Sequence, residues 1–398
     1  MDDAACPFPF TAPDPLEPPV EYAELRKQCP VSRVRLPSGD LAWLLNRYET
    51  VRRVLADDAG FSRQAITAPG APRVLPIAAG SKSIFVMDPP EHTRLRRLVS
   101  KAFTGRRIED LRPRIQQITD ELIGAMLAQG PPADLMSGLA QPLPITVICE
   151  LLGVPYADVD RFRSWTDLML TFDRGMQEQV MRAKESLDEY LTALIAAKAD
   201  QPAGDVLTAL IAARDEDEQL SQEELLAFGY TLLGAGYHAT TASLAHSLLA
   251  LLRAPGLLDR LRSDPSLLPG AVDELLRRSQ AGGGIGAVRI ATRDVELDGV
   301  LIRAGEAVLP MINSANRDES VFADPDGLLL ERRPNPHLSF GHGIHHCLGA
   351  QLGRIELEIA LGSLLRELPV LRLAVPEREL RWNAGAAFSR PMTLPLTW

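Results

Sequence analysis

Cysteines are scarce in this sequence, and long apolar runs are absent. Four cysteines occur in 398 residues, at positions 6, 29, 149 and 347, and their spacing shows no pairs. This argues against a disulfide framework and favours a reducing compartment. No run approaches the roughly 18 apolar residues of a membrane span, and the opening MDDAACPFPF lacks the basic and apolar parts of a signal peptide. We expect a cytoplasmic protein that does not bind a membrane.

Basic charge is also in short supply. The chain has 42 Lys and Arg against 52 Asp and Glu, a net charge of −10. This argues against a general nucleic-acid binder and restricts any basic patch to a local region. No repeat, low-complexity tract or linker divides the chain, so we expect one monomeric domain over residues 1–398. It would begin with an extended arm over about residues 1–20, where six prolines prevent a helix.

Helical periodicity dominates what the sequence does contain, and it predicts a mainly α protein with a smaller β region (α+β). Residues 31–45 alternate around a Ser-Gly-Asp turn, which predicts a hairpin, and 287–312 predict short strands. Residues 63–83 are rich in Pro and Gly and predict a long loop, which is uncommon in a compact domain unless it is functional. The predicted helices cover residues 91–128, 142–152, 156–173, 177–199, 204–213 and 222–253.

The predicted helix 222–253 is apolar on all sides and should run through the core. It begins with a capping box formed by Ser221 and Glu224 and ends before Pro255. Its middle, GAGYHATT at residues 234–241, has glycines and a histidine where only packing residues are expected.

The segment FGHGIHHCLG, residues 340–349, is the strongest chemical signal. Its glycines allow the backbone to approach a flat group, and Cys347 precedes a helix N-terminus, where a thiolate is stabilised. An isolated cysteine of this kind is more often a buried residue in a turn. A zinc site made of His345, His346 and Cys347 is a weaker alternative, because no second ligand pair has zinc spacing.

The same segment matches the heme-ligand signature Phe-Gly-x-Gly-x-x-x-Cys-x-Gly. Over essentially its whole length the chain resembles the cytochrome P-450 family, specifically the soluble bacterial members that receive electrons from a ferredoxin. The resemblance implies a triangular, helix-rich prism with a long central helix over heme b. It also implies that Cys347 is the axial ligand of the heme iron, that Phe340 shields the sulfur, and that Gly349 completes the cofactor-binding loop.

Two further residue groups follow from the resemblance. Glu274 and Arg277 match the family's Glu-x-x-Arg motif, and Arg332 in DGLLLER is the best third member of that buried group, although the family's Phe-Asp is replaced by two leucines. By themselves such pairs are usually surface bridges. The residues in family positions for heme propionate binding are His92, Arg96, Arg289 and His337.

A local basic segment lies between His92 and Arg114 and contains eight Lys and Arg residues. It could simply be a solvated helix face. The resemblance implies that an acidic ferredoxin docks there, supplied by a ferredoxin reductase that oxidises NAD(P)H, since the chain has no flavin or iron–sulfur motif. The eight residues are Arg94, Arg96, Arg97, Lys101, Arg106, Arg107, Arg112 and Arg114.

The central helix departs from the family pattern Ala-Gly-x-(Glu/Asp)-Thr-Thr. Counting back from Glu274 places Ala239 at the usual threonine and His238 at the usual acid, whereas a shift of one residue would restore Thr240. Ala235 and Ala239 share a face and leave room for dioxygen, and Gly236 would let the helix open locally. His238 titrates near neutrality when unperturbed and could carry protons, or it could point into a separate polar contact.

Three mechanisms remain open for proton supply. A substrate hydroxyl could replace the threonine, His238 could supply protons, or the enzyme could perform a one-electron coupling, cyclisation or rearrangement that needs no relay. We favour a monooxygenase that hydroxylates or epoxidises a hydrophobic secondary metabolite with dioxygen. A heme protein that binds a ligand or senses gas without turnover is the alternative from another class.

The resemblance also implies which segments contact the substrate. They are the loop 63–86, residues 165–181, the central helix, residues 282–288 and the turn GAAFSRPM. The candidate contacts, each equally compatible with core packing, are Phe85, Met169, Phe172, Val288 and Phe388.

Overall fold

The structure is a computed structural model and describes residues 5–72, 74, 82–169, 176–217, 220–282, 288–383 and 388–398. The chain divides into two compact units, each assembled from separate stretches of sequence. The first consists of Met1–Ser81, Phe85–Thr93 and Gly270–Cys347, and the second of Lys82–Ile84, Arg94–Pro269 and Leu348–Trp398. The expectation of one domain over the whole chain stays a prediction.

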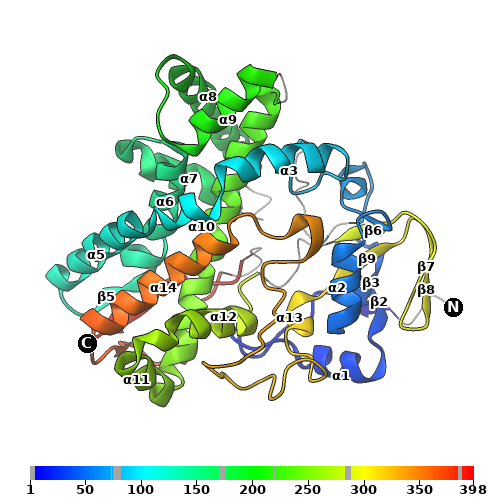
Figure 1. The fold of residues 1–398 in the computed structure, drawn as a ribbon. Helices are drawn as coiled ribbons and strands as arrows, with labels where there is room; N and C mark the ends of the chain where they lie inside the picture. Colours follow the sequence, from blue (N-terminus) through cyan, green and yellow to red (C-terminus); the bar gives the residue numbers. More distant parts are fainter. Residues whose placement is uncertain are drawn as a thin grey trace. The chain divides into compact units, whose positions relative to one another are not determined.

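The first unit contains a six-stranded sheet (Figure 1) with the order β1-β2-β3-β9-β6-β4. The hairpin predicted at 31–45 is confirmed, with Val31 opposite Leu45, and β7 and β8 form a second antiparallel hairpin. The strands are β1 (Cys6–Pro7), β2 (Val31–Arg35), β3 (Leu41–Leu45), β4 (Phe61–Ser62), β6 (Arg289–Ala291), β7 (Val295–Leu297), β8 (Val300–Ile302) and β9 (Ala307–Pro310).

Alternation along the strands places apolar side chains on both faces of this sheet. In β3, Ala42 and Leu44 belong to one buried cluster, whereas Leu45 belongs to the other. Each fully buried side chain of this kind stabilises the fold by about 1.5–3 kcal/mol. The helices of this unit are α1 (Val20–Gln28), α2 (Tyr48–Ala56), α13 (Ile312–Ala315) and nearly all of α12 (Leu268–Arg278).

The second unit is mainly helical. The predicted helices agree with the structure to within a few residues where it describes them, except that the predicted segment 91–128 is divided into three helices, with breaks at residues 103–104 and 110–111. The small sheet of this unit has the order β10-β11-β5. The helices are α3 (Glu91–Ala102, whose first turn belongs to the first unit), α4 (Gly105–Glu109), α5 (Arg112–Gln129), α6 (Pro142–Leu152), α7 (Val159–Met169), α8 (Gln177–Asp200), α9 (Val206–Asp217), α10 (Gln222–Leu252), α11 (Pro255–Ser263) and α14 (Ala350–Glu367). The strands are β5 (Ala133–Asp134), β10 (Arg372–Leu373) and β11 (Pro395–Thr397). Short turns of 3-10 or π helix occupy Gln64–Thr67, Met136–Ala140, Tyr156–Asp158, Pro265–Leu267, Gly343–His345 and Glu377–Glu379.

Helix α10 is the centre of the second unit and packs against α6, α8 and α14 (Figure 1). The predicted capping box is present: the Glu224 amide donates to the Ser221 hydroxyl at 3.1 Å, and the Ser221 amide donates to the Glu224 carboxylate at 2.8 Å.

The expectation that Gly236 opens this helix is wrong, because α10 is regular through that position. A Cβ on Gly236 would lie 2.5 Å from Cδ1 of Ile148 in α6. The glycine therefore allows two helices to pack closely and does not create a bulge.

Among the described residues, no single helix has both the length and the apolar character needed to cross a membrane. Only α10 and α11 taken together pass such a test, and the pair is bent by 103°.

Candidate functional site

The Cys347 loop is a tight turn at the end of the first unit. The Cys347 amide donates to the Phe340 carbonyl at 2.8 Å, which closes the loop. Gly341 and Gly343 both have a φ of +73°, a conformation that side chains disfavour. A side chain at Gly343 would also overlap the Leu55 backbone of α2. The loop therefore holds an exposed thiol on a backbone that depends on its glycines.

Two histidine rings meet in the first unit. His92 is buried, and its ring centroid lies 4.3 Å from that of His345, two residues before Cys347. From the sequence, His345 is named as a ligand in the weaker zinc alternative. The interaction with His92 was not visible there, since their segments are far apart in the chain.

His337 has a different partner from the one that the resemblance implies. Its Nε2 lies 3.2 Å from Oδ1 of Asp273 in α12, and its Nδ1 accepts from the Ser339 amide at 3.3 Å. Both ring nitrogens are thereby engaged within the first unit. The structure thus connects His337 to α12, and its role in propionate binding stays a prediction.

Arg289 begins β6 and is buried, with 1% of its surface exposed. Its Nη1 donates to the Phe61 carbonyl at 3.4 Å, and its Nε has no hydrogen-bond partner among the described residues. Burial lowers the pKa of Arg289 to about 10, and the charges of Asp88 and Asp58 act against this shift. A buried guanidinium with an unused donor is suited to a further anionic group.

Arg63, which the sequence did not single out, lies beside Arg289. It is 5% exposed and stacks on the Phe85 ring at 4.0 Å. Burial, followed by the charge of Arg289, lowers the pKa of Arg63 to about 9, whereas Asp88 raises it. Because two cations share this region and the oxygens of Asp88 already accept from Ser62 and the Arg63 amide, an anionic ligand is favoured. These residues therefore fit a cofactor with carboxylate groups, which is the test that a heme site must pass.

A complete ionic group lies elsewhere in the first unit. Arg277 donates to Glu274 at 2.8 Å from both Nε and Nη2, and Arg332 Nε lies 3.0 Å from Glu274 Oε2. The remaining donors of Arg277 reach the carbonyls of Asn316, Pro325 and Gly327. Burial raises the pKa of Glu274, but the hydrogen bonds from Arg277 and the Leu329 amide outweigh it, so the net pKa is lowered. The structure thus brings Glu274, Arg277 and Arg332 together.

The middle of α10 has one accessible side. Ala235 is exposed, whereas Gly236, Ala239 and Thr240 are half-buried. Ala235 and Ala239 are four residues apart, so the helical period places them on the same side of the helix. Small residues thus dominate this side of the helix.

His238 is buried, with 5% of its surface exposed. Burial lowers the pKa of His238 to about 4, and the charge of Arg390 lowers it further, while a hydrogen bond to the Thr166 backbone acts in the opposite direction. The pKa of His238 therefore lies below that of an unperturbed histidine, because its cationic form loses hydration in this environment. Tyr237, at 0% exposed, is fully packed.

The basic segment is partly neutralised within the second unit. Arg94 pairs with Glu224, Arg112 with Glu109 and Glu358, and Arg114 with Glu150. Three members are exposed and have no ion pair within the described part of the chain: Arg97, Lys101 and Arg106.

The candidate substrate contacts differ in their surroundings. Val288 is 4% exposed and packs in the sheet core, whereas Phe85 is 46% exposed beneath the Arg63 guanidinium. Phe388 is half-buried. The position of Phe172, the Met169 side chain and residues 283–287 lie outside the described residues.

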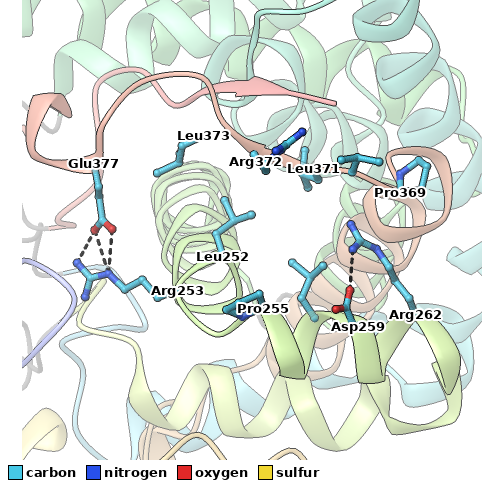
Figure 2. A pocket seen from close by; sticks show the side chains of 12 residues that line it. Leu252, Arg253, Pro255, Asp259, Arg262, Pro369, Leu371, Arg372, Leu373 and Glu377 are labelled. Atoms are coloured by element: carbon cyan, nitrogen blue, oxygen red, sulfur yellow. Dashed lines mark hydrogen bonds and ion pairs between the residues drawn. The ribbon is translucent and has the colours of Figure 1, made fainter.

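A pocket of about 560 Å³ lies in the second unit, where the end of α10, α11 and residues 369–377 meet (Figure 2). Leu252, Leu371 and Leu373 line it, and ion pairs of Arg253 with Glu377 and of Arg262 with Asp259 lie at its rim. None of the predicted site residues lines this pocket.

Comparison with known proteins identifies the family. A cytochrome P450 family model matches residues 145–391. The chain is 47% identical to nocardicin C N-oxygenase of Nocardia uniformis subsp. tsuyamanensis, over 98% of each chain. It is 46% identical to mycinamicin IV hydroxylase/epoxidase of Micromonospora griseorubida, also over 98% of each. The solved structure of SgvP, a putative thioether synthase in griseoviridin tailoring, matches with a TM-score of 0.93 and 44% identity, covering 99% of this chain and 100% of that one.

The exposed thiol in its glycine loop and the buried cations fit a heme-thiolate protein, and the comparisons give its class. The chain belongs to the cytochrome P450 family, and the cytochrome P450 fold implied by the sequence is confirmed. It is a monooxygenase of that family, and its cofactor is heme b.

Proposed function

We propose that this monooxygenase uses dioxygen and two electrons to hydroxylate or epoxidise a hydrophobic secondary metabolite in a bacterial cytoplasm. The exposed Cys347 thiol, in the same unit as the buried cations Arg63 and Arg289, is the observation that carries this proposal. The similarity to enzymes named for nocardicin C and mycinamicin IV supports the substrate class. The scarcity and scattered spacing of the four cysteines favour a reducing compartment.

The roles of the chain's own residues follow from their chemistry. Heme, when bound to a cysteine thiolate, supplies the activation of dioxygen. Cys347 would provide that thiolate, and its loop, closed by the Phe340 carbonyl, would hold the sulfur in place. In the first unit, Arg289 and His92 would bind the propionates, and we add Arg63 and His345 to this set. His337 and Arg96 stay candidates from the resemblance. Ala235 and Ala239 would leave room for dioxygen and substrate on the accessible side of α10.

The same residues are compatible with oxidative coupling or ring closure. The resemblance to SgvP, a putative thioether synthase, favours keeping this second reaction. A substrate radical needs no proton from the usual acid–threonine pair, whose places are taken by His238 and Ala239 in the favoured alignment. Product analysis decides between them: hydroxylation adds one oxygen atom to the substrate, whereas coupling removes two hydrogen atoms.

The heme assignment is tested by the carbon monoxide difference spectrum of the reduced protein. The thiolate-ligated Soret band should be present in the natural protein and lost in Cys347→Ser, because the axial ligand changes from a thiolate to an oxygen group. Cys29→Ser is the matched control, since Cys29 is also free and exposed. An unchanged band in Cys347→Ser would disprove the assignment.

The substrate class is tested by a spin-shift screen against a library of bacterial metabolites. Apolar metabolites of macrolide or cyclic-peptide size should shift the Soret band, followed by NADPH-driven product formation. Steady binding without turnover of any compound would instead favour the ligand-binding or sensing alternative.

We further propose that an acidic ferredoxin, reduced by a ferredoxin reductase, docks on Arg97, Lys101 and Arg106. They are exposed and lie in the segment that the resemblance assigns to this role. Reversing all three charges to Glu should raise the ferredoxin concentration needed for half-maximal NADPH oxidation, most strongly at low salt. Arg182→Glu is the control, because Arg182 is 74% exposed on α8, far along the sequence from this segment. Equal ferredoxin dependence in both variants would reject the docking site.

A further inference from the structure

His246 lies toward the C-terminal end of α10 and is buried, with 3% of its surface exposed. Its Nε2 lies 2.9 Å from the carbonyl oxygen of Ser389. Because a carbonyl oxygen only accepts hydrogen bonds, Nε2 carries a ring proton and donates it. The His246 ring also meets the Trp382 ring edge to face, with centroids 5.3 Å apart. One side chain of the central helix thus contacts two separate points of the C-terminal chain.

The C-terminal chain is paired with itself at these points. Trp382 lies opposite Pro391 in an antiparallel bridge, and the Asn383 amide donates to the Arg390 carbonyl at 3.0 Å. The Asn383 side chain adds two further bonds: its Oδ1 accepts from the Arg390 amide at 2.7 Å, and its Nδ2 donates to the Phe388 carbonyl at 2.9 Å. We call the paired residues 382–383 and 390–391 the C-terminal ladder.

Phe388 and Ser389 directly precede the second half of this ladder, and both of their carbonyls are bound. The Phe388 carbonyl accepts from Asn383, and the Ser389 carbonyl accepts from His246. Of these two bonds, only the one from His246 connects this part of the backbone to the central helix. It therefore determines where the half-buried Phe388 lies relative to α10.

The accessible side of α10 ends at His246. Ala235 is exposed, Ala239 and Ser243 are half-buried, and His246 is buried. These residues follow one another at intervals of three or four, so they share one side of the helix. Accessibility therefore falls along this side toward the C-terminal end of α10, and at His246 the contacts of the ring come from the C-terminal chain.

We propose that His246 is a positioning residue for substrate selection: its hydrogen bond to Ser389 fixes Phe388 as an apolar wall at the end of the accessible side of α10. This rests on the proposed function, which places the substrate on that side. A wall that is held in place before the ligand arrives favours ligands large enough to contact it, because no further ordering opposes their binding. Small ligands that do not reach Phe388 are indifferent to it.

The first test measures the anchor itself. Amide hydrogen exchange of Asn383 and Arg390, followed by nuclear magnetic resonance, should be about 2- to 10-fold faster in His246→Leu, the range for one net hydrogen bond. His246→Gln retains a donor and should exchange like the natural protein. Thr119→Val is the matched control, because it removes a buried bond to a carbonyl within α5, at 2.8 Å, away from the ladder. Equal exchange in all four proteins would overturn the anchor.

The second test measures selection with two azoles that bind heme iron through the same kind of nitrogen. Imidazole is small, whereas clotrimazole carries three aromatic rings. Soret titrations should show that His246→Leu weakens clotrimazole binding by about 2- to 10-fold and leaves imidazole binding unchanged. His246→Gln should restore the clotrimazole affinity, and Thr119→Val should keep the natural ratio. An equal loss for both azoles would reduce His246 to a general stabilising residue and reject the proposal.

A double-mutant cycle tests whether Phe388 transmits the effect. In the Phe388→Ala background, His246→Leu should no longer alter the ratio of the two dissociation constants, because the wall that it fixes has been removed. The same change of ratio in both backgrounds would show that His246 acts by another route, and the proposal would fail.

The outcomes separate this proposal from the broader one. A natural protein whose Soret band shifts with neither azole contradicts the proposed function. A natural protein that binds both, with the same ratio in His246→Leu, contradicts only the positioning role. If His246→Leu does not bind heme, His246→Met replaces it, since it also lacks a donor. The tautomer needs no such variant: nitrogen-15 resonances of the carbon monoxide-bound ferrous protein, assigned with His246→Gln, should show a proton on Nε2, and a bare Nε2 would overturn the anchor.

Discussion

Two buried ionic groups in this protein differ in how completely their partners are supplied. In the first unit, Glu274 receives hydrogen bonds from Arg277 and Arg332, and the donors of Arg277 are all used. In the second unit, Asp167 lies 3.8 Å from His238 and 3.7 Å from Arg390, and Nε2 of His238 has no hydrogen-bond partner among the described residues. A complete group stabilises one conformation, whereas an incomplete one retains capacity for a ligand or a proton.

The Arg63–Arg289 region extends this comparison. It has an excess of buried cations, which favours an anionic ligand, whereas the Asp167 cluster contains both signs of charge and has ion pairs longer than hydrogen bonds. The first is suited to a permanently bound carboxylate. The second is suited to a group that changes its protonation state.

The largest expected effect comes from breaking the complete group. Arg277→Met should lower the free energy of unfolding by about 3–5 kcal/mol, because it leaves Glu274 buried without its main partner. Arg182→Met, which removes an exposed i, i+4 pair with Glu178, should cost no more than about 0.5 kcal/mol. Urea unfolding of the heme-free and heme-bound forms measures the loss of stability in each variant. Equal losses for the two variants would show that Glu274 is not isolated from water.

Arg289→Met should weaken heme binding more than it lowers the stability of the heme-free protein. The heme-free protein should lose little stability or gain some, because an incompletely paired buried charge is removed. Heme affinity should fall about 10- to 100-fold, as expected for lost charge-assisted hydrogen bonds worth about 1.5–3 kcal/mol. Heme transfer to apomyoglobin measures the affinity, and Arg293→Met, at an arginine 63% exposed, is the control. An unchanged affinity would place the propionates elsewhere.

A matched pair of glycines tests the packing of α10 beside the incomplete cluster. Gly236→Ala should destabilise the protein by about 1–3 kcal/mol, because its Cβ overlaps Ile148. Gly234→Ala meets nothing within 4 Å and should stabilise it by about 0.5–1 kcal/mol. Thermal unfolding of both variants gives the sign. Adding Ile148→Val should reduce the loss in Gly236→Ala, and its failure to do so would show that the clash is not with that side chain.

The last prediction concerns the pH dependence of stability and Glu356, a buried carboxyl in α14. Burial raises its pKa from 4.5 to about 8, so the folded state retains a proton that the unfolded state releases. The contribution of this group to stability is therefore complete below pH 4.5 and is lost as pH rises through about 8. The stability difference between Glu356→Gln and the natural protein should shift in favour of the variant over this range. Parallel stability curves would contradict the raised pKa.

Much of the fold followed from local sequence patterns. The capping box of Ser221 and Glu224 and the stop before Pro255 placed the ends of α10 to within one residue. The alternation in 31–45 predicted the antiparallel hairpin of β2 and β3. These features depend on neighbours within a few residues, which is why a single sequence contains them.

The site was predictable only in part. The Cys347 signature and the Glu274–Arg277 motif are contiguous, so they could be read directly. Three pairs of neighbouring residues join segments that are far apart in the chain, and no local sequence pattern predicts such proximity. They are His345 with His92, Arg63 with Arg289, and Asp167 with His238. The prediction that Gly236 opens the helix was wrong for the same reason. The residue that requires a glycine at this position, Ile148, lies on another helix, so the sequence around Gly236 does not reveal it.

By itself the sequence determined the helix-rich class, the thiol in its glycine loop, and the departure from the usual acid–threonine pattern on the central helix. These depend on residue type and spacing. Only the tertiary structure decided that His238 is neutral and that an acid faces it from α7. Burial and the charge of Arg390 set the pKa of that histidine, and both are properties of the folded chain.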